Sequence, residues 1–297
     1  MRTEHRVDPA TCSGCGTCAE LCPSHAIEIA TEDGKLRARP APALADGCIR
    51  CGQCVAACPT DSISVEGLAP DRFFRLPRER LDPEALQALL ESRRSVRAFK
   101  DQPVPRQLLE RIVSMVALAP MGYTPPKLDV TVVSSREALA RALPAMVALY
   151  QQLLRAWRSP LLRWFIRREL EPDQLTGLRD HVLPTLAPRL EGTRRGRWDT
   201  ITRGAPAMLL LHSRPEAGDA TADARVAGTY ALLAAHALGL GATMIDLVPP
   251  AVNRSAEARA AFRIPEGHLV HTAVIVGFPR YRFRHGIRRE LPAVRWV

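Results

Sequence analysis

The eight cysteines constrain this chain of 297 residues more than any other feature. All of them lie before residue 59, in two sets that each read C-x2-C-x2-C-x3-C-P. The second set repeats the first at an offset of 36 residues, which indicates an internal duplication. The first set comprises Cys12, Cys15, Cys18 and Cys22, and the second comprises Cys48, Cys51, Cys54 and Cys58.

This spacing resembles that of the bacterial two-cluster ferredoxins, in which the fourth cysteine of each set binds the other cluster. Three cysteines on one tight loop cap three corners of a cubane, and the fourth ligand must come from elsewhere. The resemblance implies two [4Fe-4S] clusters, one on Cys12, Cys15, Cys18 and Cys58 and the other on Cys48, Cys51, Cys54 and Cys22. Gly14, Gly16 and Gly52 would let the backbone approach the inorganic sulfides.

The alternatives for such cysteines are a zinc site and a disulfide framework. Zinc sites normally use C-x-x-C pairs without the x3-C-P continuation, and disulfides are rare in the cytoplasm. The start of the chain, MRTEHRVDPATC, has no basic-then-apolar signal pattern, and no run of about 18 uncharged apolar residues occurs. We therefore expect a cytoplasmic chain that does not span a membrane.

The charge of the chain is unevenly distributed. The net charge is +10, yet residues 1–70 carry 6 Lys and Arg against 9 Asp and Glu, which leaves 35 against 22 for the remainder. The acidic and basic parts could attract each other, and the basic part could attract a phosphate-bearing cofactor or an acidic redox partner. We expect no nucleic-acid partner.

The chain is long enough for two domains. We expect a small ferredoxin-like α+β domain over residues 1–68, with short strands at 26–30 and 62–66 that follow the cysteine sets. Residues 69–81 mix Pro and Arg without periodicity and are expected to form a linker. The larger domain then covers residues 82–297.

The larger domain is expected to be an α/β layered structure. A helix begins at Asp82-Pro83 with Leu86, Leu89 and Leu90 as its buried face, and a second begins at Pro105. Strands are predicted at 130–133, 207–211, 242–248 and 269–278. In a helix over 223–239, Val226, Tyr230, Leu233 and Ala237 share a face.

An insertion runs from about residue 138 to 200. The stretch from about 145 to 170 is predicted to be helical, apolar on one side and rich in arginine on the other. Basic amphipathic helices can bind an anionic membrane surface. They more often pack on their own domain, cover an active site or join a dimer interface, and these alternatives stay open.

Three guanidiniums and a hydroxyl lie within five residues, at Arg93, Arg94, Ser95 and Arg97. Arginine binds phosphate in bidentate fashion and serine can donate to it as well. A solvated basic helix end is the common alternative.

From about residue 83 to the end, the chain resembles the FMN-dependent nitroreductase family, in particular its branch with a ferredoxin module in front. RRSVRAF matches the opening motif of the family, which implies that Arg93, Arg94, Ser95 and Arg97 contact FMN. The resemblance implies a three-layer α+β sandwich and a homodimer with FMN between the subunits.

Two further segments carry the resemblance. The turn after Gly239-Leu240-Gly241 implies that Ile245, Asp246 and Leu247 lie against the reactive edge of the flavin, although a helix C-cap glycine explains the same pattern. The basic tail implies phosphate contacts from Arg288 and Arg289, and from Arg284 less strongly. The resemblance also implies that Met121 and Gly122 lie in a loop beside the flavin, although APMGYTPPK departs from the usual family motif there.

Together these patterns predict an FMN-dependent oxidoreductase that takes electrons through its clusters. Its substrate would be a small electrophile with a nitro group, a quinone or an activated double bond. An electron relay without its own substrate, or an NAD(P)H-dependent flavin reductase, is the alternative. Ferredoxin, flavodoxin or NAD(P)H could be the donor. Tyr123 and Lys127 are weak candidates for a proton donor, and His212 is expected to be structural.

Overall fold

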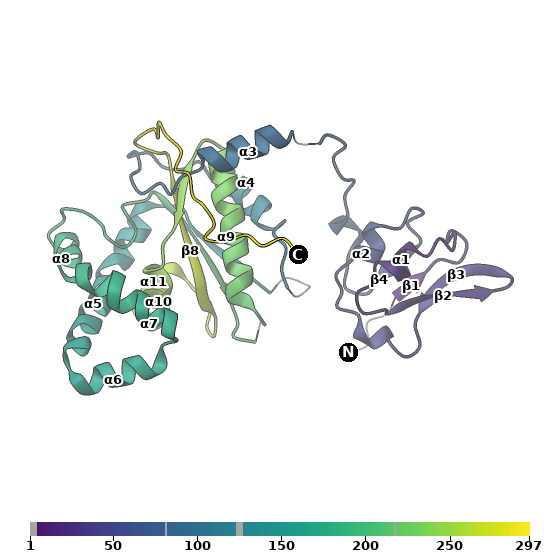
Figure 1. Ribbon diagram of the computed structural model, residues 1–297, viewed down its shortest axis with the longest axis horizontal. Helices are drawn as coiled ribbons and strands as arrows, with labels where there is room; N and C mark the ends of the chain where they lie inside the picture. The colour runs from purple at the N-terminus through teal and green to yellow at the C-terminus, as the bar shows by residue number, and fades with distance from the viewer. Residues whose placement is uncertain (1–4, 81, 123–126, 217) are drawn as a thin grey trace. The chain divides into compact units, whose positions relative to one another are not determined.

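The computed structural model describes residues 5–80, 82–122, 127–216 and 218–297, and the chain forms two compact units (Figure 1). One unit comprises Met1–Arg80 together with Met121–Lys127, and the other comprises Leu81–Pro120 and Leu128–Val297.

The first unit contains two small antiparallel sheets. Strand β1 (His5–Val7) pairs with β4 (Ile63–Val65), and β2 (Ile27–Glu32) pairs with β3 (Lys35–Pro40). The β2–β3 hairpin turns at Asp33 and Gly34, which both have positive φ, as the tight turns that suit twisted strands require. Four short helical turns complete the unit: α1 (Thr17–Glu20), η1 (Ala45–Gly47), α2 (Gln53–Ala56) and η2 (Pro70–Arg72).

The cysteine duplication is a structural duplication as well. Helices α1 and α2 begin 36 residues apart, and so do β2 and β4. Equivalent side chains have equal exposure, since Cys18 and Cys54 are both 8% exposed and Ile27 and Ile63 are both 4% exposed. The strands expected at 26–30 and 62–66 are present as β2 and β4. The sequence did not predict β1 and β3, because β1 is short and β3 is rich in charged residues.

The second unit is built around one sheet with the order β5-β6-β8-β7, in which all neighbouring strands are antiparallel. The four strands are β5 (Asp129–Val133), β6 (Ala207–Ser213), β7 (Gly241–Met244) and β8 (Leu269–Gly277). Every residue of β6 is buried, so both faces of the sheet are covered. The expected strands are therefore present, and they form an antiparallel sheet.

Helices cover both faces of this sheet, which gives three layers (Figure 1). On one face α9 (Ala220–Ala237) packs against β6, β7 and β8, and α4 (Arg106–Val116) packs on α9. On the other face, Met208, Leu210 and Ile275 share a core with α5 (Arg136–Arg158), α8 (Leu183–Arg194), α10 (Val248–Arg254) and α11 (Ala256–Phe262). Alternation of side chains along β6 and β8 separates the two cores.

Small residues form the face of α9 that meets the sheet. Ala224, Ala227, Ala231 and Ala235 are fully buried, whereas Val226 is 38% exposed. The helix lies so close to the sheet that a Cβ on Gly228 would meet Met244 Cε at 2.7 Å. The contact with the sheet is therefore formed by alanines, and not by the larger apolar residues that were predicted to share a face.

The first helix of this unit, α3 (Pro83–Ser92), begins at the predicted proline but is not buried as predicted. Leu86 and Leu90 are 43% and 50% exposed, and Leu89 is half-buried. An apolar stripe indicates that a helix has a partner but does not identify the partner. In contrast, α4 buries Leu109, Ile112 and Val116.

The strand predicted over 242–248 is too long. Strand β7 ends at Met244, residues 245–247 turn, and α10 begins at Val248. Pro249 and Pro250 explain the difference, because proline is favoured in the first turn of a helix and cannot donate to a strand ladder.

The insertion is helical, as expected. After α5 it comprises α6 (Pro160–Glu169), α7 (Pro172–Thr176), η3 (Gly177–Val182) and α8. Met146 and Tyr150 of α5 are buried in their own unit, whereas Trp164 and Phe165 of α6 are 52% and 50% exposed. The apolar face of α5 therefore packs within its own unit, whereas the large apolar side chains of α6 stay exposed. None of the helices formed by the described residues is long and apolar enough to cross a bilayer.

The end of β8 gives a test of the packing. Gly277 pairs with Gly241, and a Cβ at Gly277 would lie 2.6 Å from Pro206 Cδ and 2.7 Å from Phe99 Cδ1. We expect Gly277→Ala to lower the free energy of unfolding by about 1–3 kcal/mol in a denaturant titration followed by circular dichroism. Gly177→Ala is the control, since a Cβ there meets nothing within 4 Å. Equal stability of the two variants would contradict this packing.

Candidate redox-cofactor sites

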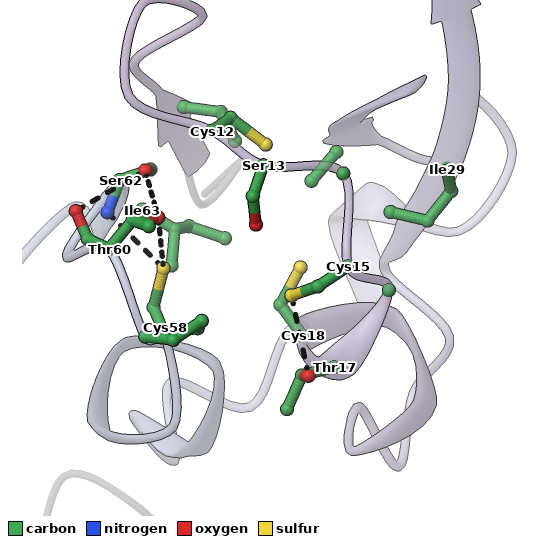
Figure 2. Close-up of a pocket in the computed structure, with 15 residues that line it drawn as sticks. Cys12, Ser13, Cys15, Thr17, Cys18, Ile29, Cys58, Thr60, Ser62 and Ile63 are labelled. Carbon is green, nitrogen blue, oxygen red and sulfur yellow. Dashed lines mark hydrogen bonds between the residues drawn. The ribbon is translucent and has the colours of Figure 1, made fainter. Parts of the chain in front are cut away.

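The first cavity of the ferredoxin-like unit is lined by the thiols of Cys12, Cys15, Cys18 and Cys58 (Figure 2). It has an empty volume of about 330 Å³. Cys12 and Cys15 lie in the loop that leads into α1, Cys18 lies in α1 itself, and Cys58 comes from the segment that leads into β4. The fold therefore brings the fourth cysteine of the second set to the first three of the first set.

A second cavity, of about 310 Å³, is lined by Cys22, Cys48, Cys51 and Cys54. The grouping is again crossed, because Cys22 belongs to the first set of the sequence. All eight cysteines are free thiols, so no disulfide competes for them. Each cavity thus offers the set of four thiols that the ferredoxin resemblance implies for one cluster.

Backbone amides donate to the crossing cysteines in both halves of the duplication. The Ala26 N–H donates to Cys22 Sγ at 3.2 Å, and the Ser62 N–H donates to Cys58 Sγ at 3.2 Å. These two donors are 36 residues apart, like the cysteines they contact. Hydrogen bonds to cluster-bound sulfur stabilise negative charge there and raise the reduction potential.

The thiols differ in how readily they ionise. Burial raises the pKa of Cys54 to about 11 and also raises the pKa of Cys18 and of Cys48. The Thr17 hydroxyl, in contrast, holds the pKa of Cys15 below its usual range. Buried thiols give up their protons when a bound metal supplies positive charge. The donor set fits an iron–sulfur cluster on these grounds.

The glycines of the cysteine loops adopt backbone conformations that residues with a side chain rarely adopt. Gly14 has a φ of +68°, and a Cβ on it would overlap the carbonyl of Leu36. Gly16 and Gly52 have φ of +82° and +76°, at the start of α1 and of α2. L-residues with a side chain rarely adopt this backbone conformation.

In the second unit, the arginine motif lies beside the edge strand β7. Ser95 forms a parallel bridge with Ala242, and the Val96 N–H donates to the Ala242 carbonyl at 3.1 Å. Val96 is buried, so Arg97 on the next position projects outward and is exposed. Packing of Val96 therefore fixes the direction of the polar residues on either side of it.

Positive charges gather at this motif. Burial lowers the pKa of Arg93, and Arg94 and Arg289 lower it further. His236, whose Nε2 lies 2.8 Å from Ser92 Oγ, has a pKa that is lowered by burial and by Arg93 and Arg94. In the part of the chain that the structure describes, no carboxylate forms an ion pair with Arg93 or Arg94. The local field favours an anion.

The basic tail contributes to the same place. A Cβ on Gly286 would lie 3.0 Å from Arg94 Nη2, so the tail passes directly over Arg94. Arg94 donates to the carbonyls of Glu91 and Arg93 at 2.5 and 2.6 Å, while its buried Nε has no partner. An unpaired buried donor is costly, and a bound phosphate oxygen would satisfy it. Arg288 and Arg289 are exposed in the tail.

The structure adds one residue that the sequence reasoning missed. Arg203 is half-buried, with a φ of 57° and a buried Nε that has no partner. Its pKa is lowered by burial and by Arg189 and Arg97, which Asp199 opposes. A left-handed arginine just before a buried strand is unusual, but the sequence shows no motif that would have singled it out.

The turn that follows β7 is held from both sides. The Ile245 N–H donates to Ala273 O at 2.9 Å, and the Tyr150 hydroxyl donates to Leu247 O at 2.6 Å. Burial raises the pKa of Tyr150, so its hydroxyl remains a donor. Ile245 is buried and Asp246 is exposed. This turn and the arginine motif are linked through β7, which bridges to Ser95.

Other predicted residues are not brought together in this way. Met121 and Gly122 belong to the first compact unit, whereas the other residues predicted to bind FMN belong to the second. Lys127 is exposed, and Tyr123 lies outside the described residues. His212 is buried in the second unit, and its Nε2 lies 2.8 Å from Thr131 Oγ1.

Two family models match the chain. Residues 90–278 match the model of the nitroreductase family, and residues 11–62 match that of the 4Fe-4S dicluster domain. The second match contains every cysteine, and the first contains the arginine motif and the turn after β7.

Among characterised sequences, a protein named putative NADH dehydrogenase/NAD(P)H nitroreductase, from Leptothrix cholodnii, is 31% identical over 160 residues. This match covers 54% of the chain and 70% of that protein. An iron–sulfur component of CoB–CoM heterodisulfide reductase, from Methanopyrus kandleri, is 63% identical over 30 residues. That match covers 10% of the chain and 5% of the heterodisulfide reductase component, so the chain spans only a small fraction of this relative.

Solved nitroreductase structures share the fold. One with bound FMN from Bacteroides fragilis has a TM-score of 0.53 at 20% identity and covers 71% of this chain and 98% of its own. Another with bound FMN, from Desulfitobacterium hafniense, has a TM-score of 0.53 at 21% identity and covers 73% and 100%. The predicted three-layer fold with a ferredoxin-like unit is confirmed. The chain belongs to the nitroreductase family of oxidoreductases and carries a 4Fe-4S dicluster domain in front of that family's domain.

Proposed function

We propose that this chain is an FMN-dependent oxidoreductase that takes electrons through two [4Fe-4S] clusters and reduces a small electrophile at the flavin. The observation that carries the proposal is the occurrence, in one chain, of two four-thiol cavities and a nitroreductase domain with an unpaired cationic site. Each part alone would fit a simpler protein. Together they fit a chain that receives electrons at one unit and uses them at the other.

The proposed ligands of the first cluster are Cys12, Cys15, Cys18 and Cys58, and those of the second are Cys22, Cys48, Cys51 and Cys54. The amides that donate to Cys22 and Cys58 would stabilise the sulfur of the crossing ligand in both clusters. Iron–sulfur clusters pass electrons one at a time. An external one-electron donor such as a ferredoxin or flavodoxin suits this input.

FMN is proposed for the second unit, as in the relatives with bound FMN. Its phosphate would lie among Arg93, Arg94, Arg288 and Arg289. Among the described residues, no carboxylate forms an ion pair with Arg93 or Arg94, and the buried Arg94 Nε lacks a partner. Ser95 and Arg97 would contact the ribityl chain and pyrimidine edge, and the turn at Ile245, Asp246 and Leu247 the reactive edge of the ring. Met121 and Gly122 are proposed to flank the ring.

Bound FMN would supply the ability to collect two electrons and deliver them to one substrate. The substrate class proposed is a nitro compound, a quinone or an activated double bond. The protein would position the substrate and neutralise charge, with Arg203 as a further cation near Arg97. A second candidate is direct oxidation of NAD(P)H, which the name of the Leptothrix cholodnii relative favours.

We also propose a homodimer. Apolar side chains on α3 and on the tail lie in solvent in the single chain, including Leu90 at 50% exposure and Trp296 at 93%. A dimer interface would cover these side chains. The domain boundaries proposed are 1–68 and 82–297, with 69–81 as the linker. Free thiols of this number suit the reducing cytoplasm.

The enzyme is tested with the full chain, purified without oxygen and loaded with iron, sulfide and FMN. We expect reduced ferredoxin to drive steady consumption of a nitroaromatic or a quinone. Flavin that is reduced by ferredoxin but never reoxidised by these substrates would instead indicate an electron relay and contradict the proposal. Bleaching of the flavin band by NADH or NADPH alone would establish the second candidate as the route of electron entry.

The phosphate contact is tested by Arg93→Ala. We expect its affinity for FMN, titrated into the flavin-free protein and followed by fluorescence, to fall about 10- to 100-fold, because a charge-assisted hydrogen bond is lost. Riboflavin, which lacks the phosphate, should bind the variant and the wild type equally. Arg111→Ala, on an exposed position of α4, is the control. An equal loss for FMN and riboflavin would place Arg93 away from the phosphate.

The crossed ligand sets are tested with two double variants. If the ligation is crossed, Cys12→Ala with Cys58→Ala damages one cluster and leaves about four iron atoms per chain. Cys12→Ala with Cys22→Ala damages both clusters and leaves almost none. Ligation within each set predicts the opposite pattern. Iron analysis and electron paramagnetic resonance of the reduced proteins distinguish the two patterns.

A further inference from the structure

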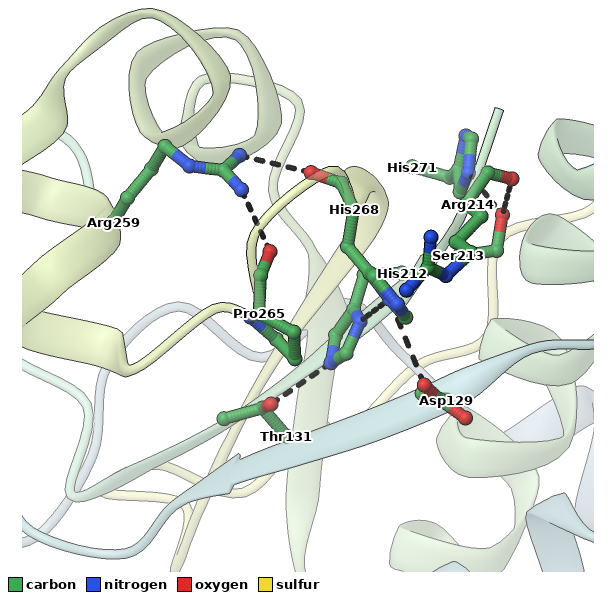
Figure 3. A network of polar contacts seen from close by, with 9 residues as sticks. All are labelled: Asp129, Thr131, His212, Ser213, Arg214, Arg259, Pro265, His268 and His271. Carbon is green, nitrogen blue, oxygen red and sulfur yellow. Dashed lines mark hydrogen bonds and ion pairs between the residues drawn. The ribbon is translucent and has the colours of Figure 1, made fainter. Parts of the chain in front are cut away.

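A second group of metal-ligating side chains lies in the larger unit, at one end of its sheet (Figure 3). Asp129 begins β5, His212 is near the end of β6, and His268 immediately precedes β8. One ligand atom from each of the three lies within 4.8 Å of the others. The two imidazoles are largely buried, with His212 at 2% exposure and the His268 side chain at 11%, while the carboxylate of Asp129 reaches solvent.

The local fold directs these side chains toward one point. Asp129 and His212 are direct cross-strand partners. The register between β6 and β8 shifts at Leu211/His212, so that Leu211 pairs with Thr272 but His212 pairs with Val270. Such a bulge re-aims a side chain and is common beside functional sites. A turn at Gly267, with a φ of +75°, brings His268 to the same place.

The distances fit a hydrogen-bonded pair of histidines, and they also place all three ligand atoms within reach of one cation. His212 Nδ1 and His268 Nδ1 are 2.9 Å apart, and His268 Nδ1 is 3.6 Å from Asp129 Oδ2. When two neutral imidazoles face each other through Nδ1, one proton lies between the two nitrogens. The carboxylate of Asp129 is beyond hydrogen-bond distance of His268 Nδ1. Nitrogen and oxygen ligands about 2 Å from a common cation would be separated by distances of this order.

The surroundings provide the support that a metal-binding histidine normally has. The other ring nitrogen of His212, Nε2, is 2.8 Å from Thr131 Oγ1, which fixes the ring orientation. Arg259 donates to the carbonyls of His268 and Pro265, both at 2.9 Å, and so holds the loop that carries His268.

This group is distant from the proposed flavin site. Ser95 bridges to Ala242, which pairs with Val276 of β8, whereas His212 pairs with Val270. Six residues of extended strand separate these two positions, which corresponds to about 20 Å. The two sites therefore lie at opposite ends of the sheet.

We propose that Asp129, His212 and His268 form a binding site for a divalent transition-metal cation of the zinc type. Binding would displace the proton between the two Nδ1 atoms to solvent, and the imidazole that carried it would take up a proton on its Nε2, so that both ligands are neutral. The bound ion would keep a fourth position for water. Imidazole and carboxylate ligands suit zinc and its neighbours in the first transition row. Because three separate segments supply the ligands, the bound ion would join β5, β6 and the turn before β8.

The test uses the full chain with its clusters and flavin in place, so that the cysteines are occupied. The protein is dialysed against micromolar zinc, and zinc and iron per chain are measured by mass spectrometry. We expect about one zinc per chain with unchanged iron, and a higher melting temperature in zinc. Asp129→Asn and Thr131→Val should each lower zinc affinity by about 10- to 100-fold, and His268→Gln by more.

His271→Gln is the matched control. His271 lies three residues from His268, and its two ring nitrogens contact the hydroxyls of Ser213 and Thr221 at 2.9 and 3.2 Å. This variant should bind zinc like the wild type. Asp129 is exposed and Thr131→Val is isosteric, so both variants should fold, which their melting temperatures without zinc will verify. Zinc that binds only as iron is lost, or that binds equally to an Asp129→Asn/His268→Gln variant, would overturn the proposal.

Discussion

The pairing of β6 with β8 is the interaction on which the larger unit depends. Both strands are almost completely buried, so their hydrogen bonds form away from water and their two faces support two separate cores. The edge strand β7 joins this pair at one end, and the arginine motif joins β7 through Ser95. The histidines gather at the opposite end. The positions of the arginine motif and of the histidines thus depend on the register of the buried β6–β8 pair.

The ferredoxin-like unit depends on a different constraint. Its apolar core is small, and two of the buried side chains in it are the cysteines Cys18 and Cys54. Because the fourth thiol of each set lies in the cavity of the other set, neither half can form its site without the other. A unit of this size gains much of its stability from bound metal, as is common in small metal-binding domains.

The sequence predicted the elements better than their partners. Pro83 and Pro105 mark helix starts that depend on local backbone preferences, and the strands carry their own apolar runs. The predicted burial of Leu86 and Leu90 is wrong because an amphipathic pattern does not reveal which surface covers it. The predicted strand at 242–248 is also wrong at its end, since the prolines after Val248 favour a helix.

Some residues of the candidate sites could likewise be predicted from the sequence, whereas others could not. The grouping of the cysteines could be predicted because their spacing resembles that of the two-cluster ferredoxins, which implies that the fourth cysteine of each set binds the other cluster. The crowding of Arg93 with Arg289, and the inclusion of Arg203, depend on how distant segments pack, which no local pattern encodes. The cluster around His212 was equally invisible, because a strand bulge and a turn over 50 residues away create it.

The alanine face of α9 has a consequence for the turn at Ile245, Asp246 and Leu247. A Cβ on Gly228 would lie 2.7 Å from Met244 Cε and 3.1 Å from Thr272 Cγ2, so glycine leaves room for the Met244 side chain between the helix and the sheet. A larger residue at this position would displace that side chain. Met244 is the last residue of β7, so the packing of α9 bears on the residue directly before the turn.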